Sequence, residues 1–302
     1  MKNEEFATAL SATSSTSSSS STSSPSTPPR GGVREGLEGG LFGLIGFPLG
    51  HSFSKGFFTE KFAREGIDAQ YLNFEIPDAS MLIDVLRDNP ELRGLNVTLP
   101  HKQAVIPLLD ELSDEAREIG AVNVIKISQL DKFTIGQLPT DEIVKSSNSK
   151  IVKLKGFNSD IIGFMESIRP LLQPHHTKAL VLGTGGASKA ICVGLKRLGL
   201  EWTYVSRTPR EGMLTYEDLS AEVMQAYTVI VNCSPVGMYP KVDAAPAIPY
   251  ELLTSRHLLF DCVYNPEDTL FLKRGREQGA TGKNGLEMLH LQAVASWKFW
   301  NE

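Results

Sequence analysis

A glycine-rich turn between two short apolar runs constrains the fold of this chain more than any other stretch. The run at 179–182 is typical of a buried parallel strand, and a second strand is predicted at 202–205. Between them, apolar residues recur on one helical face, and Gly199 is placed to end that helix in a left-handed conformation. Such a βαβ unit brings backbone N–H groups and a helix N-terminus to a pyrophosphate, although the same turn also occurs in ordinary α/β domains. The residues predicted to face a dinucleotide are Gly183, Gly185, Gly186 and Ala187.

The end of the second predicted strand distinguishes between the two common dinucleotides. A site for NAD usually has Asp or Glu about 20 residues after the first glycine, where it holds the ribose 2′-hydroxyl. This chain has Ser206, Arg207 and Thr208 there instead. A guanidinium and hydroxyls can hold a 2′-phosphate through charge-assisted hydrogen bonds, whereas a carboxylate would repel it. We therefore expect NADP(H); a solvated surface arginine is the alternative, and Arg210 can share the role.

Length, charge and cysteine content narrow the class of protein. The 302 residues suit two domains with sizeable cores. A net charge of −5 argues against a nucleic-acid or anionic-membrane partner, and no apolar run is long enough to span a bilayer. Cys192, Cys233 and Cys262 are far apart in the sequence and have no metal-ligand spacing. We expect buried, reduced thiols, no metal site and a cytoplasmic protein.

Two segments lack the periodicity of packed elements. Residues 1–40 are rich in Ser, Thr, Pro and Gly, and such a composition buries too little apolar surface to offset the entropy of ordering. We expect a disordered tail. Its serine content is compatible with a transit peptide, but its early acidic residues and near absence of arginine argue against one. Residues 141–150 are polar without a period and predict the mobile tip of a hairpin.

In the first folded half, strand patterns alternate with helix patterns, which predicts a largely parallel sheet. Ligands of such sheets bind beyond the carboxyl ends of the strands. Polar residues end or follow several of the predicted strands, and His101 and Lys102 are expected to open a helix. The polar side chains would suit a polyhydroxylated small molecule, and they are Ser52, Ser54, Asn96, Thr98, Lys102 and Asn123.

Each of these residues also has a simpler interpretation. The two serines can cap the helix that follows them, and Asn96 and Thr98 can satisfy turn backbone. Lys102 can be a solvated lysine. Asp160 stands directly before an apolar run and can be only a helix N-cap. Several polar residues at one edge of a sheet nevertheless favour a shared site.

A series of short motifs follows the same order along the chain. They are GFPLGHSFS at 46–54, NVTLPHK at 96–102, GAVN at 120–123, GFNSD at 156–160, GTGGA at 183–187, SRT at 206–208, NCSPVGM at 232–238 and NGLEML at 284–289. Together they resemble the shikimate dehydrogenase family, and the resemblance extends from about Gly43 to the C-terminus. The chain departs from the family pattern at Lys55, Ser159 and Thr184, where Pro, Thr and Ala are usual.

The resemblance implies NADP-linked reduction of 3-dehydroshikimate to shikimate, a step of chorismate and aromatic amino acid biosynthesis. It implies an α/β fold of two domains, a mostly parallel substrate-binding domain and a Rossmann-type NADP domain. Lys102 and Asp160 match the family's catalytic pair. Its substrate contacts match Ser52, Ser54, Thr98, Asn123, Tyr264 and Gln292. Further cofactor contacts are expected from Ser234, Gly237, Met238 and Gly285.

The corresponding domain limits are a tail at 1–40, a substrate-binding domain at 41–157 and an NADP domain at 158–284. A final helix at 285–302 packs back on the first domain and brings Gln292 to the substrate, although Gln292 can also be a solvated helix residue. We expect a monomer or homodimer. Two rival functions share most motifs: a quinate/shikimate dehydrogenase that uses NAD, and a nucleotide-responsive binding protein without catalysis. Arg207 argues against the first, and retention of both Lys102 and Asp160 argues against the second.

Overall fold

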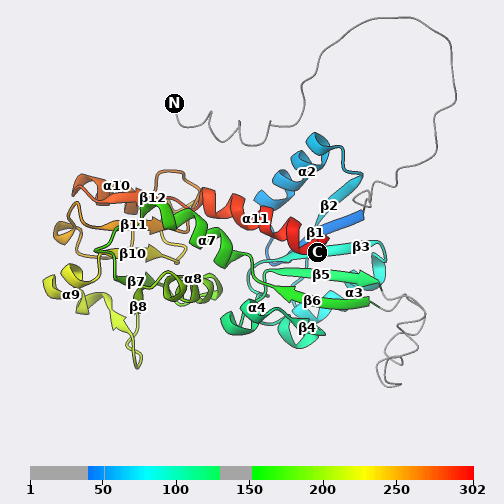
Figure 1. Ribbon diagram of the computed structural model, residues 1–302, viewed down its shortest axis with the longest axis horizontal. Coiled ribbons are helices and arrows are strands. Elements are labelled where there is room, and N and C mark those ends of the chain that lie inside the picture. Colours follow the sequence, from blue (N-terminus) through cyan, green and yellow to red (C-terminus); the bar gives the residue numbers. More distant parts are fainter. Residues whose placement is uncertain (1–39, 51, 130–151) are drawn as a thin grey trace, which may run out of the picture. The chain divides into compact units, whose positions relative to one another are not determined.

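The computed structural model describes residues 40–50, 52–129 and 152–302. The predicted tail at 1–39 and the predicted hairpin tip at 141–150 lie outside the described residues. Gly40, the last residue of the predicted tail, already belongs to the first strand. Within the described ranges the strands form two six-stranded sheets, each accompanied by helices (Figure 1). The predicted α/β class with two sheets is confirmed.

The first sheet is mixed rather than wholly parallel. Its strand order is β2-β1-β3-β5-β6-β4. β1 runs parallel to β2 and β3, but β5 runs antiparallel to both β3 and β6. The antiparallel pair β5–β6 agrees with the hairpin predicted across 126–155. The bounds are β1 Gly40–Gly46, β2 Ala69–Glu75, β3 Leu92–Val97, β4 Glu111–Leu112, β5 Val124–Gln129 and β6 Val152–Phe157.

The helices of this half start and stop where capping chemistry allows. Ser52 caps α2 through its hydroxyl, and Gly66 ends that helix with a φ of 64°. The predicted helix at His101–Lys102 is wrong, because those residues lie in turns that lead into a short 3₁₀ helix containing Pro107. Proline lacks an N–H and disfavours helical geometry in the residue before it. The bounds are α2 Phe53–Glu65, η1 Ala79–Met81, α3 Leu82–Asp88, η2 Ile106–Leu108 and α4 Asp114–Ile119.

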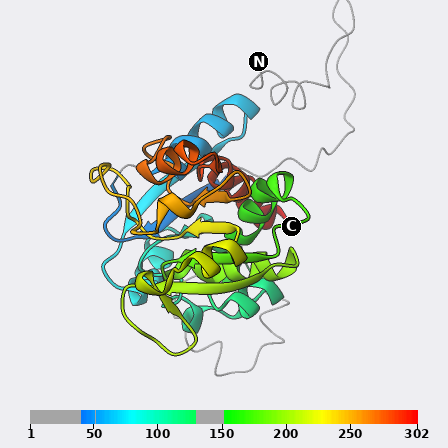
Figure 2. The same ribbon diagram turned by 90° about the vertical axis from the view of Figure 1, so that its left-hand side faces the viewer.

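The second sheet contains the predicted βαβ unit, and its strand pairings within the described residues are all parallel. Its order is β12-β11-β10-β7-β8-β9, and Figure 2 turns this sheet toward the viewer. Helix α8 connects β7 to β8, and Gly199 after it has a φ of 82°, which confirms the predicted left-handed end. The strands are β7 Lys178–Leu182, β8 Glu201–Ser206, β9 Leu214–Thr215, β10 Val229–Asn232, β11 Leu258–Asp261 and β12 Thr281–Lys283. The helices are α8 Gly186–Arg197, η4 Tyr216–Asp218, α9 Ala221–Ala226, η5 Tyr250–Leu252 and α10 Leu270–Glu277.

Helix α11 (Leu286–Asn301) packs along α7 (Asp160–Ile168), which continues into η3 (Arg169–Leu171). It also contacts β3 and β5, so the end of the chain returns to the first sheet (Figure 1). Trp300 is buried there, and its indole N–H donates to the carbonyl of Ile125 at 3.1 Å. Aromatic rings of β1, β2, α2 and α11 surround Trp300 and build one core cluster. Across the described ranges, none of the helices combines the length and apolar character that a membrane crossing needs.

Gly94 offers a test of how tightly α11 packs on the first sheet, and Gly56 in α2 serves as its control. Gly94 in β3 lies directly under the Trp300 indole, so a Cβ at that position would overlap the ring. We expect Gly94→Ala to lower the free energy of unfolding by about 1–3 kcal/mol through overpacking. Gly56 is exposed inside α2 with open space around it, so Gly56→Ala should instead add roughly 0.5–1 kcal/mol. Urea unfolding of both variants measures this; equal effects of the two substitutions would contradict the packing argument.

Candidate active site

Lys102 and Asp160 meet at one edge of the first sheet. The Lys102 Nζ lies 2.6 Å from Asp160 Oδ2, and the two side chains are only 14% and 10% exposed. Lys102 follows β3, and Asp160 follows β6 as the first residue of α7. Because β3 and β6 both run antiparallel to β5, they point the same way and end at the same edge. Strand direction therefore brings together two residues that are 58 positions apart.

Asn123 completes the contacts of the Asp160 carboxylate. Its Nδ2 donates to Asp160 Oδ1 at 2.8 Å, and its Oδ1 accepts from the backbone N–H of Ser159 at 2.7 Å. Both carboxylate oxygens of Asp160 are thus engaged by side chains, and the helix N-cap is Ser159. The N-cap interpretation of Asp160 is wrong. Asn123 reaches this edge because it precedes an antiparallel strand, not because it ends a parallel one.

The other predicted residues of the first half occupy different environments. Ser52 makes the cap bond, accepting from the N–H of Lys55 at 3.2 Å, so the simpler interpretation holds for its acceptor side. Ser54 lies close to the buried Tyr71 hydroxyl, and Thr98 is half-buried just past β3. Asn96 is buried inside β3, accepts from the Tyr71 hydroxyl at 2.8 Å and donates to Ser296 Oγ at 2.9 Å. Sequence patterns missed Tyr71 and Ser296, since a single polar residue in an apolar stretch carries no periodic signal.

Two residues from the second half also reach this region. Gln292 on α11 is 8% exposed, and its Oε1 accepts from Ser159 Oγ at 3.3 Å, so the solvated alternative is wrong. Tyr264 follows β11 and is half-buried, with its ring centroid 6.2 Å from that of Phe53 at the start of α2. Burial raises the pKa of the Tyr264 phenol, which is therefore neutral near neutral pH.

The glycine turn lies close to Lys102. Gly183 has a φ of 99°, and a Cβ there would come within 3.2 Å of the Ser234 backbone nitrogen. A Cβ on Gly186 would lie 3.8 Å from Lys102 Cβ, whereas one on Gly185 would meet open space. Ala187 follows Gly186 in the first turn of α8, where backbone N–H groups have no partner within the helix. The turn thus offers open room, free donors and a helix N-terminus beside Lys102.

Beyond the end of β8, basic and polar side chains are exposed. Arg207, Thr208 and Arg210 are all accessible. Ser206 is buried, and its hydroxyl accepts from the N–H of Thr208 at 3.3 Å, so it shapes this turn. Over the residues that the structure describes, no ion pair is found for Arg207. This guanidinium is available to an anionic group.

A second turn follows β10. Asn232 accepts through Oδ1 from both the backbone N–H and the hydroxyl of Ser234, at 3.0 and 2.6 Å. Gly237 has a φ of 89°, and Met238 after it is 45% exposed. Gly285 is buried so close to the carbonyl of Cys262 that a Cβ would clash with it. The four predicted cofactor residues of this region therefore lie near the ends of β10 and β11; they are Ser234, Gly237, Met238 and Gly285.

Asp261 supports this turn from beneath. It is fully buried at the end of β11 and accepts from Asn232 Nδ2 at 2.9 Å and from Thr269 Oγ1 at 2.6 Å. Burial raises the pKa of the Asp261 carboxyl to about 6, although Thr269, Val263 and Asn232 donate to it. Sequence reasoning missed this residue; the signal available was a carboxylate closing the apolar run at 258–260.

The raised pKa of Asp261 gives a testable pH dependence. Because the folded pKa exceeds the unfolded one, the group favours the folded state most below its unfolded pKa and loses that advantage as pH rises through about 6. From about pH 4 to about pH 7.5, the free energy of unfolding of the wild type should fall relative to Asp261→Asn by on the order of 2–3 kcal/mol. Urea titrations at both pH values measure it. Parallel pH profiles of the two proteins would contradict the raised pKa.

The cysteines differ in part from the sequence expectation. All three are free thiols, but only Cys192 is buried; Cys233 and Cys262 are half-buried. The register of β10 and β11 places these two side by side, with 3.9 Å between their sulfurs. Burial raises the pKa of Cys192 to about 11, so it is a protonated, unreactive thiol. In the described parts of the chain no cluster of three or more His, Cys, Asp or Glu could hold a metal ion.

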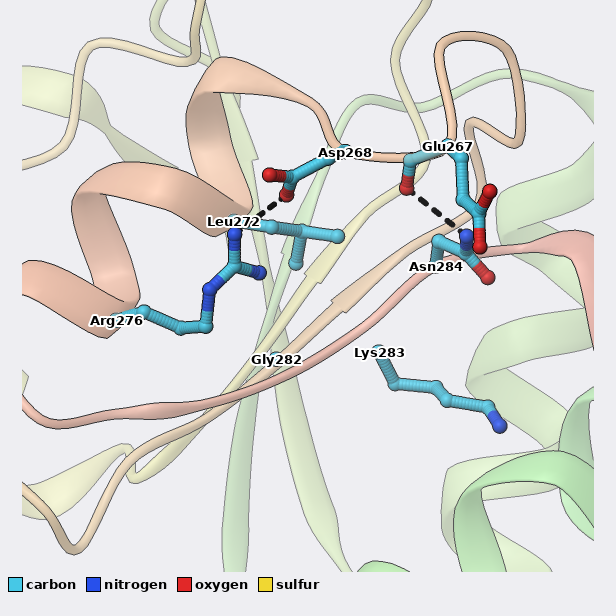
Figure 3. Close-up of a pocket in the computed structure, with 7 residues that line it drawn as sticks. All are labelled: Glu267, Asp268, Leu272, Arg276, Gly282, Lys283 and Asn284. Carbon is cyan, nitrogen blue, oxygen red and sulfur yellow. Dashed lines mark hydrogen bonds and ion pairs between the residues drawn. The ribbon is translucent and has the colours of Figure 1, made fainter. Parts of the chain in front are cut away.

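A surface pocket of about 380 Å³ lies elsewhere, between α10 and the β11–β12 edge of the second sheet (Figure 3). Three of its charged groups already have partners: Arg276 pairs with Asp268 at 2.5 Å, and Lys283 pairs with Glu287 at 2.5 Å. Asn284 donates to the carbonyl of Glu267 at 2.9 Å, as Figure 3 shows. This pocket contains none of the residues around Lys102.

A glycine turn on the parallel second sheet, next to a mostly buried Lys–Asp pair on the first sheet, is typical of a nucleotide-dependent α/β oxidoreductase. Comparison with known proteins narrows the class. Residues 44–125 match the family model for the shikimate dehydrogenase substrate binding domain. The chain is 33% identical over 279 residues to shikimate dehydrogenase (NADP(+)) of Desulforamulus reducens, covering 85% of this chain and 88% of that protein. The protein belongs to the shikimate dehydrogenase family.

Solved structures agree with this assignment. The chorismate mutase/shikimate 5-dehydrogenase fusion protein from Clostridium acetobutylicum superposes with a TM-score of 0.70 at 33% identity, covering 88% of this chain and 92% of that one. Shikimate 5-dehydrogenase from Thermus thermophilus, solved in complex with NADP(H) and shikimate, gives 0.69 at 29% identity, with 86% and 92% covered. The similarity therefore spans both sheets.

Proposed function

We propose that the protein is an NADP-dependent shikimate dehydrogenase that interconverts 3-dehydroshikimate and shikimate. The observation that carries this proposal is the 2.6 Å contact between Lys102 and Asp160 beside the glycine turn. A ketone and its alcohol differ by a hydride and a proton. This site offers a place for a nicotinamide nucleotide and, next to it, a lysine that can exchange the proton. The names of the family relatives support the substrate.

The residues present fit NADP(H), which supplies or accepts the hydride when bound. The turn from Gly183 to Ala187 would hold the pyrophosphate with backbone N–H groups and the α8 N-terminus. Arg207 and Thr208 would hold the 2′-phosphate, because both are exposed beyond β8. The turn around Ser234, Gly237 and Met238, together with Gly285, would line the nicotinamide half.

Lys102 handles the proton. As an ammonium it donates to the substrate oxygen that becomes negative during reduction, and its positive field stabilises that oxygen. In the oxidative direction the neutral amine accepts the proton from the substrate hydroxyl. Asp160 keeps Lys102 oriented through the ion pair and accepts a hydrogen bond from an adjacent substrate hydroxyl. Asn123 keeps the Asp160 carboxylate in place.

The hydroxyls near α2 suit the substrate's carboxylate. Ser52 accepts the cap bond with its oxygen, so its O–H remains free to donate, and Ser54 lies in the first turn of the same helix. A helix N-terminus favours an anion through its partial positive charge. Thr98 and Tyr264 would donate to the same group, while Gln292 would contact a ring hydroxyl.

We assign substrate binding to residues 41–157 with the helix at 285–302, and NADP binding to 158–284. The family match at 44–125 and the contacts of α11 with β3 and β5 support these limits. Three free cysteines suit a reducing compartment such as the cytoplasm.

Lys102 and Asp160 should behave as one catalytic unit. Positioned acid–base groups contribute about 10² to 10⁴ in rate, so Lys102→Ala should lower kcat by a factor in that range and leave NADPH affinity intact. Asp160→Asn preserves size and should also lower kcat strongly, since an amide cannot pair with the ammonium. The double variant should fall well short of the product of the single effects. Steady-state assays with shikimate and NADP⁺ measure this. Near-normal turnover of Asp160→Asn would remove Asp160 from the catalytic pair.

Cofactor choice should depend on Arg207. Only NADPH has the 2′-phosphate, so Arg207→Ala should weaken NADPH binding about 10- to 150-fold and barely change NADH binding. Arg169→Ala, an exposed arginine on η3, is the matched control and should change neither. Titrations with both nucleotides, and turnover with shikimate and quinate, also test the NAD-linked rival. Equal weakening of both cofactors would refute the assignment of Arg207.

A further inference from the structure

A continuous row of buried polar side chains links the far side of the first sheet to the Lys102–Asp160 pair. It begins at the Tyr71 hydroxyl on β2, which donates to Asn96 on β3. Asn96 donates to Ser296 Oγ on α11 at 2.9 Å. Ser296 Oγ lies 3.2 Å from Ser159 Oγ, and Ser159 in turn contacts Asn123. Asn123 then donates to Asp160, so this row, Tyr71–Asn96–Ser296–Ser159–Asn123, ends on the catalytic carboxylate.

Chemistry fixes the donors and acceptors in this row at every link except the one between Ser159 and Ser296. Tyr71 donates to Asn96 Oδ1, which leaves the NH₂ of Asn96 to face Ser296. The Ser296 proton goes to the carbonyl of Gln292 at 2.8 Å, so the Ser296 oxygen accepts from Asn96. The single hydroxyl proton of Ser159 has three acceptors within reach, Ser296 Oγ at 3.2 Å and Gln292 Oε1 and Asn123 Oδ1 at 3.3 Å, and it completes the row when it points at Ser296. At the other end, the backbone N–H of Ser159 donates to Asn123 Oδ1. The Nδ2 of Asn123 must therefore point at Asp160.

Ser296 lies in the middle of the row, outside all the sequence motifs, and none of its hydrogen bonds within the described residues goes to Lys102 or Asp160. Its side chain is fully buried on α11. Its hydroxyl contacts both Asn96 and Ser159, and so joins the two halves of the row. Removing a buried acceptor leaves the donors facing it unsatisfied, and they relax toward other partners. Relaxation of Ser159 would reach Asn123, and through Asn123 the carboxylate of Asp160.

We propose that Ser296 is a positioning residue that acts through Ser159 and Asn123 on the Lys102–Asp160 pair; this inference rests on the proposed dehydrogenase function. Asn96, expected from the sequence to contact substrate, accepts from Tyr71 through its Oδ1 and donates to Ser296 through its NH₂. The C-terminal helix thereby orients the proton-transfer group as well as completing the core.

Ser167 provides a matched control. It is also a buried serine in a helix, and its hydroxyl donates to the carbonyl of Phe164 at 3.0 Å without reaching the site. Both Ser296→Ala and Ser167→Ala delete one hydroxyl while raising helix propensity. A structural role alone predicts similar kinetics for the two variants. The positioning role predicts that only Ser296→Ala changes the chemical step.

The test measures kcat, the KM for NADP⁺ and shikimate, the pH profile of kcat/KM and the melting temperature of each variant. Ser296→Ala should lower kcat about 3- to 10-fold, shift the pH profile and leave the KM for NADP⁺ within about twofold. Ser167→Ala should keep the wild-type kcat and pH profile. Tyr71→Phe removes the hydroxyl at the far end of the row and keeps the ring that stacks on Phe58, so it should show a smaller loss of the same kind.

The double variant Ser296→Ala/Tyr71→Phe should lose less than the product of the two single losses, because both substitutions disrupt the same row. The proposal is overturned if Ser296→Ala matches Ser167→Ala in kcat and pH profile, or if the double variant is strictly multiplicative. If Ser296→Ala does not fold, an unchanged kcat and pH profile in Tyr71→Phe overturns it in the same way. A wild type without NADP⁺-dependent shikimate oxidation would instead refute the proposed function.

Discussion

The ion pair between Lys102 and Asp160 is mostly withdrawn from water, and the surrounding structure has to compensate for that desolvation. Removing two charges from water costs free energy. Their mutual attraction offsets that cost only when the ion pair has good geometry and further hydrogen bonds satisfy both groups. Here Asn123 supplies one of those bonds, and the backbone of Ser159 fixes Asn123. Strand direction in the first sheet makes this possible. Because β5 runs antiparallel to β3 and β6, the first residue of β5 lies at the same edge as the last residues of β3 and β6.

The last helix of the chain connects this edge to the core. α11 buries Trp300 against β3 and β5 at one end and Gln292 beside Ser159 nearer the middle. Gly163 in α7 lets it approach closely, since a Cβ there would clash with the Met288 carbonyl. The residues that stabilise the first sheet and those that orient its catalytic pair therefore share one helix. Damage to its packing would therefore affect both the core and the site.

The second sheet supports a cofactor in a different way. Its binding turns carry few charges, and their shapes depend on buried groups under them. Asp261 holds Asn232, and Asn232 holds Ser234, so a carboxylate that meets no ligand sets the conformation of the turn after β10. α8 is placed beside Lys102 by contacts with the first half, including Lys189 with Gln103 at 2.9 Å and Arg197 with Glu118 at 2.6 Å. These last pairs are exposed, and each adds little stability.

The sequence by itself determined the βαβ unit, the capping of α2 by Ser52, and the identity of Lys102 and Asp160 as the polar pair of interest. These features depend on local periodicity, on glycine conformations and on short motifs, all of which are contained within a few residues. Only the tertiary structure decided that β5 is antiparallel, that Asp160 is not a helix cap, that Gln292 is buried and that Asp261 lies under the second turn. It also decided that Ser296 and Asn96 meet, although 200 positions separate them. Such contacts depend on how helices and strands pack across the sheet, and a lone polar residue in an apolar stretch gives no local sign of the partner it will find.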